Sequence, residues 1–280
     1  MILRSEEVAM HSGVAKDRPK NRQISIHEMD LEIITVPVLN DNLSFVLYRL
    51  GSETAVVIDP SEADPLVHLL KELNLNVGLI LNTHHHPDHV GGNLELQERY
   101  GADVVCSAID LTRVPGATRG LADGEYVECA DVRLQTISIP GHTRGQVAFH
   151  SERDNAVFVG DTLFSMGCGR LYEGTAAEMW RSLSRLKKLP PDERLYFGHE
   201  YTERNAVFAK SVALDPGAID RRLASAREEM RRSGIAAAPT LQEEIEVNPF
   251  LRPLATRIAA VFGGDELATF TELRRLRDAY

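Results

Sequence analysis

A dense histidine cluster follows a short apolar run, and this feature constrains the fold more than any other part of the chain. Residues 83–89 read THHHPDH, which places four histidines and one aspartate within six positions, directly after the apolar run at 77–81. If that run is a buried strand, side-chain alternation directs His84 and His86 to one side and His85 to the other. Two imidazoles on one side of a strand end can bind the same metal ion, so the cluster predicts a metal site.

The residues after the third histidine extend this prediction to a second position. The turn that begins at Pro87 re-aims Asp88 and His89 toward a neighbouring point, and imidazole and carboxylate ligands suit zinc, iron and manganese alike. Gly91 and Gly92 allow close approach of the backbone just before the next helix. The alternative is a solvated polar loop or a tag-like run, but neither explains Pro-Asp at this spacing behind an apolar strand.

Three further polar residues end apolar runs in the same way. His142, Asp161 and His199 each follow a glycine near the carboxyl end of an apolar run. Proteins with mixed helices and strands build their sites at that end of their strands. Each of these residues alone would read as an ordinary loop residue. Taken together with the histidine cluster, the three strand ends predict one pocket.

The chain alternates strands and helices up to about residue 200 and is largely helix-forming after that point. Its first three β-rich runs read as an antiparallel meander, because Asn-Asp-Asn and Gly-Ser turns separate them. The expected strands are 31–38, 43–50, 54–60, 77–81, 103–106, 132–139, 146–150, 156–160 and 194–197, the expected helices are 62–73, 93–100 and 175–187, and the later helix-forming stretches are 202–234 and 253–278. We therefore expect a disordered extension at 1–29, a mixed domain at 30–200 and a helical domain at 201–280.

Composition narrows the partners and the compartment. The chain has 280 residues, with 31 Lys and Arg against 41 Asp and Glu, and the net charge of −10 disfavours nucleic acid and anionic membranes as partners. Three cysteines without a CxxC pair fit a reducing compartment. No apolar run is long enough for a transmembrane helix, and the N-terminal residues lack the apolar core of a secretory signal. We expect a cytoplasmic protein.

Several short motifs follow one another in order along the chain. The histidine cluster contains His-x-His-x-Asp-His, and a separate His, Asp and His follow it. The other motifs are Gly-Asp-Thr-Leu-Phe at 160–164, Gly-Cys-Gly-Arg at 167–170, Tyr-Glu-Gly at 172–174, Gly-His-Glu-Tyr-Thr at 198–202 and Asn-Pro-Phe at 248–250. In this order they resemble the metallo-β-lactamase fold superfamily, and within it the glyoxalase II family of hydroxyacylglutathione hydrolases. The similarity runs from about Leu31 to the C-terminus.

The resemblance implies an α+β fold, a metallo-β-lactamase-type αββα sandwich with a C-terminal helical domain. It also implies two divalent metal ions, with zinc expected first and iron or manganese as alternatives. The implied ligands are His84, His86 and His142 for the first ion and Asp88, His89 and His199 for the second, with Asp161 bridging both. Asp59 matches an aspartate that supports a ligand histidine, since a metal-bound imidazole needs an acceptor for its other N–H. A turn-forming aspartate before Pro60 is the alternative.

The same resemblance implies an enzyme that hydrolyses S-(2-hydroxyacyl)glutathione thioesters, such as S-D-lactoylglutathione, and separately we expect a monomer. A hydroxide shared by the two ions would attack the thioester carbonyl, and Asp88 would be the catalytic residue that orients it. Cys168 is expected to pack in its loop rather than to react. The implied glutathione contacts are Arg170, Tyr172, Tyr201, Arg274 and Arg277. Arg274 and Arg277 stand where the family has Arg-x-x-Lys, and they could instead form only ion pairs within their helix.

Other functions of the same fold are alternatives. A sulfur dioxygenase that oxidises glutathione persulfide with one iron needs fewer ligands than the set found here. Some β-lactamases use a cysteine ligand in place of the bridging aspartate, and here that position is Asp161. A non-catalytic metal-binding scaffold would tolerate a degenerate site, but every expected ligand is present. RNA processing is disfavoured by the net charge of −10.

Overall fold

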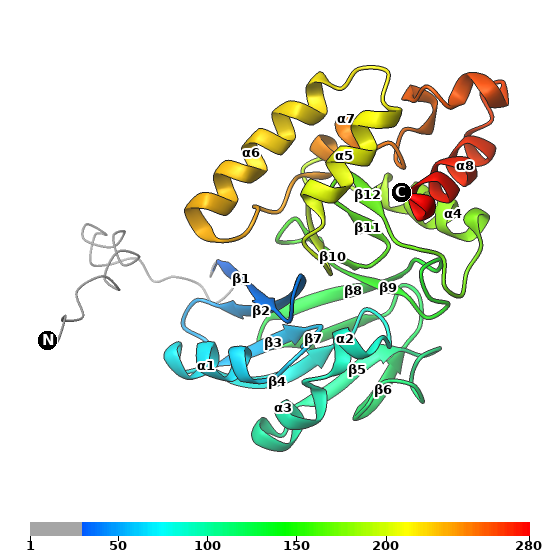
Figure 1. Ribbon diagram of the computed structural model, residues 1–280. Coiled ribbons are helices and arrows are strands. Elements are labelled where there is room, and N and C mark those ends of the chain that lie inside the picture. The colour runs from blue at the N-terminus through cyan, green and yellow to red at the C-terminus, as the bar shows by residue number, and fades with distance from the viewer. Residues whose placement is uncertain (1–29) are drawn as a thin grey trace, which may run out of the picture. The chain divides into compact units, whose positions relative to one another are not determined.

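Two β-sheets pack face to face, and helices cover the outer face of each sheet (Figure 1). The computed structural model describes residues 30–280, so the expectation of a disordered extension at 1–29 lies outside the described residues. The arrangement confirms the predicted α+β class and the αββα sandwich. Within the described residues, no helix is long and apolar enough to cross a membrane.

The first sheet has the strand order β1-β2-β3-β4-β5-β6. The pairs β1/β2 and β2/β3 are antiparallel, which confirms the predicted meander, whereas the pairs from β3 to β6 are parallel. The strands of this sheet are β1 Leu31–Val38, β2 Asn42–Arg49, β3 Thr54–Ile58, β4 Asn76–Leu81, β5 Asp103–Ser107 and β6 Ala117–Leu121.

The second sheet has the order β13-β10-β9-β8-β7, and a separate two-stranded ribbon pairs β11 with β12. Only β10 and β13 run parallel in this sheet, and its other pairs are antiparallel. These strands are β7 Tyr126–Cys129, β8 Val132–Ser138, β9 Val147–Ser151, β10 Ala156–Gly160, β11 Leu163–Phe164, β12 Gly167–Cys168 and β13 Arg194–Phe197.

Apolar side chains fill the space between the sheets and the space under the helices. Phe45 of the first sheet meets Phe158 of the second edge-on, with ring centroids 5.2 Å apart. On the outer face of the first sheet, helix α1 buries Leu66 and Leu70. The other helices of this half are α2 Pro87–Val90 and α3 Asn93–Tyr100, and α1 spans Asp64–Glu72; α4 Ala176–Leu186 lies instead on the side of the second sheet.

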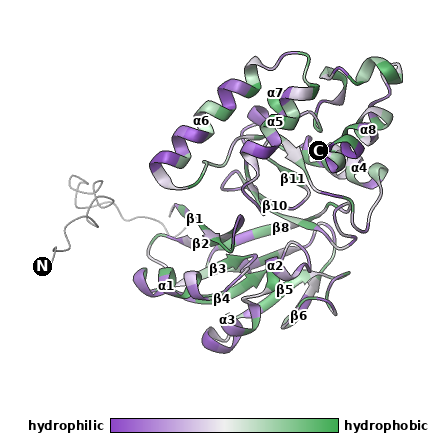
Figure 2. Ribbon diagram, viewed as in Figure 1, coloured by the Kyte–Doolittle hydropathy of each residue, from purple (hydrophilic) through white to green (hydrophobic). Residues whose placement is uncertain are grey.

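The C-terminal part is helical, as predicted, and lies against the outer face of the second sheet. Phe270 and Leu273 of α8 share a core with Leu183 of α4 and Phe208 of α5. Figure 2 shows hydrophilic colour along much of α6, whereas the strands beneath are mainly hydrophobic. The elements of this part are α5 Thr202–Val212, α6 Gly217–Ser233, α7 Leu241–Val247, η2 Pro253–Ala255, η3 Ala259–Phe262 and α8 Glu266–Ala279.

One helix-forming stretch differs from the prediction. Pro253–Ala255 and Ala259–Phe262 form the 3₁₀ turns η2 and η3, and the α-helix starts only at Glu266. Gly263 and Gly264 both have positive φ, at 59° and 88°, so the backbone leaves the right-handed region between them. These two glycines separate α8 from the turns that precede it.

Candidate metal centre

The predicted ligand residues follow strand ends that meet at one edge of the sandwich. Asp59 directly follows β3, and Asp161 directly follows β10. His84 comes shortly after β4, and His199 comes shortly after β13. His142 lies on the connection between β8 and β9. Because the buried strands stop at this edge, the polar residues that follow them are collected around one volume.

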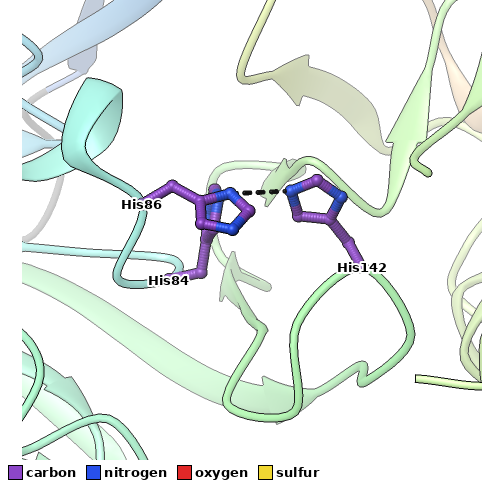
Figure 3. Close-up of side chains that lie close together, drawn as sticks. All are labelled: His84, His86 and His142. Atoms are coloured by element: carbon purple, nitrogen blue, oxygen red, sulfur yellow. Dashed lines mark hydrogen bonds between the residues drawn. The ribbon is translucent and has the colours of Figure 1, made fainter. Parts of the chain in front are cut away.

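Three histidines form the first group, and their ring nitrogens converge (Figure 3). His84 Nε2 lies 3.0 Å from His86 Nδ1, and His142 Nε2 lies 3.0 Å from the same atom. His85 turns away and places its Nδ1 3.2 Å from Asp110 Oδ2, as strand alternation predicts. The fold therefore brings three ring nitrogens together around one point, in an arrangement suited to a metal ion.

Asp88, His89 and His199 form the second group. His89 Nε2 lies 3.4 Å from His199 Nε2, and Asp88 Oδ2 lies 3.4 Å from that same nitrogen. Pro87 begins the short helix α2, which turns Asp88 and His89 toward this point. One carboxylate oxygen and two ring nitrogens thus form a second set of ligand atoms.

Asp161 lies between the two groups. Its Oδ2 is 3.4 Å from both His142 Nε2 and His199 Nε2, and its Oδ1 is 3.4 Å from His89 Nε2. Oδ1 is buried and has no hydrogen-bond partner among residues 30–280. A buried carboxylate oxygen without a donor is costly unless a cation compensates it, so this atom fits the role of a metal ligand. A carboxylate in contact with both groups has the placement that a bridging ligand requires.

Burial and charge divide the histidines into two electrostatic classes. Burial lowers the pKa of His84 well below its usual value and lowers the pKa of His86 to about 4. Burial acts in the same direction on His89, but Asp161 and Asp59 outweigh it and raise the His89 pKa to about 9. The first group therefore presents neutral imidazoles, the form that binds metal ions, while the carboxylates favour positive charge at the second group.

Asp59 holds the histidine cluster from behind. Its Oδ1 accepts a hydrogen bond from the Thr83 backbone N–H at 2.8 Å, and its Oδ2 accepts one from Thr83 Oγ1 at 2.6 Å. Oδ2 also lies 3.0 Å from His89 Nδ1, so His89 Nε2, the other ring nitrogen, faces His199. These are the contacts of a residue that orients a ligand histidine.

Two residues beside the second group are absent from the sequence-based predictions. Asp41 Oδ1 lies 2.9 Å from His199 Nδ1, and Asn42 Nδ2 donates to Asp88 Oδ2 at 3.0 Å. Both belong to the Asn-Asp-Asn segment that reads as a turn between two strands; Asp41 lies in that turn, and Asn42 is the first residue of β2. Their local sequence is that of a turn, so the contacts with His199 and Asp88 become visible only in the folded chain.

Glycines precede the site residues for a steric reason. A Cβ atom at Gly198 would lie 2.3 Å from Asp161 Oδ1 and 2.7 Å from His89 Cε1. At Gly160, where φ is +48°, a Cβ would lie 2.4 Å from Thr83 Oγ1. Any other residue at these positions would displace the carboxylate or the histidine cluster, because real Cβ contacts do not come so close.

A pocket of about 480 Å³ opens beside the two groups, a volume suited to a small-molecule ligand. Both the sandwich and the helical part contribute to its walls. The lining residues are His86, Asp88, His142, Asp161, Phe164, Cys168, Arg170, Tyr172, His199, Tyr201, Arg204, Asn205, Arg274 and Arg277.

The pocket includes every residue that the family resemblance implies as a substrate contact: Arg170, Tyr172, Tyr201, Arg274 and Arg277. The Tyr172 ring packs edge-on against the His86 and His142 rings, with centroid distances of 5.5 and 5.3 Å. The Tyr201 ring stacks on the His199 ring at 4.8 Å. The two tyrosines therefore border the first and the second group respectively.

Cys168 lies in the pocket wall as a buried thiol. Burial raises its pKa, so the thiol stays protonated at neutral pH and is a poor nucleophile. Its carbonyl oxygen accepts a hydrogen bond from Arg274 Nη1 at 2.6 Å. These contacts agree with the packing role expected for this residue.

Comparison with known proteins first shows the superfamily to which residues 40–199 belong. Residues 40–199 match the family model described as the metallo-β-lactamase superfamily, in agreement with the sandwich and its strand-end histidines. ETHE1 from Myxococcus xanthus has this fold, with a TM-score of 0.64 at 22% identity over 87% of this chain and 90% of that one. TTHA1623 in a di-iron-bound form gives a TM-score of 0.55 at 26% identity over 78% of this chain and 99% of its own.

The C-terminal part narrows the class to one family. Residues 200–280 match the family model described as the hydroxyacylglutathione hydrolase C-terminus. A protein from Methylococcus capsulatus named hydroxyacylglutathione hydrolase is 45% identical over 89% of this chain and 99% of its own length. The chain belongs to the hydroxyacylglutathione hydrolase family, which confirms the resemblance drawn from its motifs.

Proposed function

We propose that this protein hydrolyses the thioester bond of an S-(2-hydroxyacyl)glutathione, such as S-D-lactoylglutathione, to a 2-hydroxy acid and glutathione. The observation that carries the proposal is the position of Asp161, which contacts both groups of ligand atoms beside an arginine-lined pocket. The name of the relative from Methylococcus capsulatus supports the same activity.

We also propose that the site holds two divalent ions, with zinc as the first choice and iron or manganese as alternatives. The residues that would hold them are His84, His86 and His142 for one ion and Asp88, His89 and His199 for the other, with Asp161 shared. The di-iron form of TTHA1623 supports the number of ions. When bound, such ions polarise a carbonyl group and lower the pKa of water, which makes a nucleophile available at neutral pH.

The protein's own residues position the reactants. Asp88 receives a hydrogen bond from Asn42 at 3.0 Å, which fixes its carboxylate at the pocket, where it orients the attacking water. The rings of Tyr172 and Tyr201 shield the histidines on either side. Hydrolysis forms a C–O bond from water and breaks the C–S bond. The departing sulfur takes one of the two water protons, and the other is released when the product acid ionises.

We further propose that residues 30–200 are the catalytic domain, that residues 201–280 are the substrate-binding domain, and that the protein acts as a cytoplasmic monomer. Both parts line the pocket, and one chain supplies the whole lining described. The free thiols Cys106, Cys129 and Cys168 fit a reducing compartment. The net charge of −10 supports the expectation that neither nucleic acid nor membrane is a partner.

Two measurements on the purified protein test the proposal: thiol release from S-D-lactoylglutathione, and elemental analysis of the bound metals. We expect turnover with about two ions per chain, and a loss on the order of a thousandfold in Asp161→Ala. The exposed Asp103→Asn on β5 is the matched control and should keep full activity. Wild-type turnover by Asp161→Ala would refute the proposed role of the site. Oxygen consumption with glutathione persulfide, in the absence of thioester hydrolysis, would favour the sulfur dioxygenase instead.

A further inference from the structure

We propose that Asp110 is a positioning residue that fixes the histidine cluster through His85 and thereby sets the affinity of the first group for its ion. Asp110 lies on the loop 108–116 between β5 and β6, and it is not part of the pocket lining. The proposal rests on the two-ion site proposed above, because only a group that holds an ion has an affinity to set. It gives a role to His85, the one histidine of the cluster that is not an expected ligand.

Asp110 is a buried carboxylate, and its side chain is 0% exposed. Its Oδ2 lies 3.2 Å from His85 Nδ1, and its Oδ1 accepts a hydrogen bond from Arg113 Nη1 at 3.3 Å. A Cβ at Gly145 would lie 2.5 Å from Oδ1, so the backbone of the β8–β9 connection closes over the carboxyl group. A carboxylate removed from water in this way is costly unless its partners are held in place. The contacts with His85 and Arg113 offset that cost.

The neighbours of His85 determine which of its ring nitrogens carries the proton. Arg113 Nη2 lies within hydrogen-bond distance of His85 Nε2. A guanidinium can only donate, so Nε2 is the acceptor. Nδ1 of the neutral ring then carries the proton and donates it to Asp110 Oδ2. With both nitrogens engaged, the ring is held on the side of the chain away from the first group.

A fixed His85 ring holds the backbone between two ligands. His84 and His86 are its neighbours in sequence, and residues 84–86 lie between β4 and α2, outside any helix or strand. The regular hydrogen bonds of a helix or strand therefore do not fix this segment, whereas Asp59 fixes Thr83 just before it. The contacts of His85 supply the corresponding restraint in the middle of the segment. They preserve the 3.0 Å separation of His84 Nε2 and His86 Nδ1.

The same contacts reach the loop that carries the third ligand of the first group. Arg113 pairs with Glu173, whose Oε2 accepts a hydrogen bond from the backbone N–H of Arg144 at 2.9 Å. Arg144 comes two residues after His142, so both loops of the first group meet this network. The second group has its own supporting residues, which are Asp41, Asn42 and Asp59. Loss of the Asp110 carboxylate should therefore affect the first ion and spare the second.

Removal of zinc from the zinc-loaded full chain by a chromophoric chelator tests the proposal. The competition gives one dissociation constant for each ion, and His142→Ala identifies the constant of the first group. Asp110→Asn leaves one acceptor oxygen in place of two, which cannot serve both His85 and Arg113. We expect it to raise the first constant about five- to tenfold, below the roughly 10- to 100-fold typical of a direct partner of a ligand histidine, because Asp110 acts through His85. The second constant should change less than about twofold.

The matched control is Asp103→Asn, which changes an exposed carboxylate at the start of β5 and should alter neither constant. An unchanged first constant in Asp110→Asn would overturn the proposal, and so would an equal rise of both constants. A lower thermal midpoint with both constants unchanged would show that Asp110 only stabilises its loop, which also overturns it.

Two variants of His85 show whether Asp110 acts through this ring. His85→Phe keeps a planar ring and removes both nitrogens, so it should raise the first constant as Asp110→Asn does, with no further rise in the double variant. His85→Asn places an amide N–H near the position of Nδ1 and should recover part of the affinity. Additive changes in the double variant would show that Asp110 acts independently of His85 and would overturn the proposal. If Asp110→Asn does not fold, the comparison of His85→Phe with His85→Asn decides the assignment.

These measurements need no turnover, so their outcome is separate from that of the proposed function. A wild type that binds two zinc ions, shows the selective change in Asp110→Asn and releases no thiol would refute thioester hydrolysis and support the role of Asp110. A wild type without a zinc constant for the first group would overturn that role whatever its turnover.

Discussion

Asp59 Oδ2 lies 3.0 Å from His89 Nδ1, and each of the two side chains is only 1% exposed. The same carboxylate accepts hydrogen bonds from the backbone and the hydroxyl of Thr83. Asp59 directly follows β3, and Thr83 follows β4, so one buried side chain ties the ends of two parallel strands to the histidine cluster. This contact directs His89 Nε2 toward His199, the other histidine of the second group.

Asp59→Asn should weaken metal binding without unfolding the protein. An amide has only one acceptor oxygen, so it cannot serve both Thr83 and His89 as the carboxylate does. We expect metal affinity to fall about 10- to 100-fold, as is typical when the partner of a ligand histidine is removed. Competition with a chromophoric chelator measures the change. Glu72→Gln, on the exposed face of α1, should leave affinity as it is, and an unchanged affinity in Asp59→Asn would contradict the assigned role.

Arg113 and Glu173 form an ion pair that anchors the loop carrying Tyr172. Glu173 Oε2 also accepts a hydrogen bond from the Arg144 backbone N–H at 2.9 Å. The hydrogen bond from Arg113 lowers the pKa of Glu173 to about 2, so the pair is ionised at neutral pH. We expect Glu173→Gln to raise KM about two- to fivefold with little change in kcat, since Tyr172 loses an anchor.

A double-mutant cycle checks this coupling. Arg113→Gln, Glu173→Gln and the double variant should give a coupling free energy of about 0.5–1 kcal/mol in urea unfolding, because the pair is partly exposed. Strictly additive free energies would show that the ion pair does not anchor the loop.

Glu244 is a buried carboxylate that holds the β11–β12 ribbon to α7. Its Oε1 accepts from Ser165 Oγ at 2.9 Å, and its Oε2 accepts from the Met166 N–H at 2.8 Å and from Asn248 Nδ2 at 3.1 Å. Burial raises its pKa above the model-compound value of 4.5. We expect Glu244→Gln to lower the free energy of unfolding by less than about 1 kcal/mol, since the Ser165 hydroxyl can turn to accept a hydrogen bond from the new amide. Glu244→Ala should lower it by about 2–4 kcal/mol.

The pH dependence of unfolding follows from the direction of that shift. A carboxyl group with a raised pKa in the folded state holds its proton more tightly there than in the unfolded chain. Its contribution to stability is therefore complete below pH 4.5, the unfolded value, and is lost as pH rises through the folded pKa. Relative to Glu244→Gln, the wild type should lose stability across that window in urea titrations. A constant difference between the two would contradict the shift.

Removal of metal should lower the thermal midpoint together with activity. Ions that bind only the folded chain stabilise it by RT ln(1 + [M]/Kd), so a chelator should lower the midpoint and added metal should restore it. Thr175→Ala breaks the capping box of α4 and should cost about 1 kcal/mol whether or not metal is present. A midpoint that does not respond to the chelator would contradict a structural contribution from the ions.

Local patterns were sufficient to predict most strands, and the family resemblance implied both groups of candidate ligand residues, which the structure brings together. The strands around the site are short apolar runs, such as Val147–Ser151 and Ala156–Gly160, whose residues are all buried, so hydrophobicity alone reveals them. Asp161 directly follows Ala156–Gly160, and His84 and His199 lie within three residues of the ends of β4 and β13. By contrast, β6 and β7 were missed, because ATRGL and YVEC are short and largely polar or exposed.

The partners of each site residue depended on tertiary structure. Asp41 meets His199 across 158 positions of sequence, and Arg274 meets Cys168 across 106. Nothing near Asp41 distinguishes it from a turn residue, and nothing near Arg274 shows that its donors are already engaged. The sequence by itself determined which side chains can bind metal, since strand periodicity and motif spacing are local. Only the tertiary structure decided which residues lie behind those side chains and which donors of Arg274 are already engaged, because these depend on contacts between segments far apart in the chain.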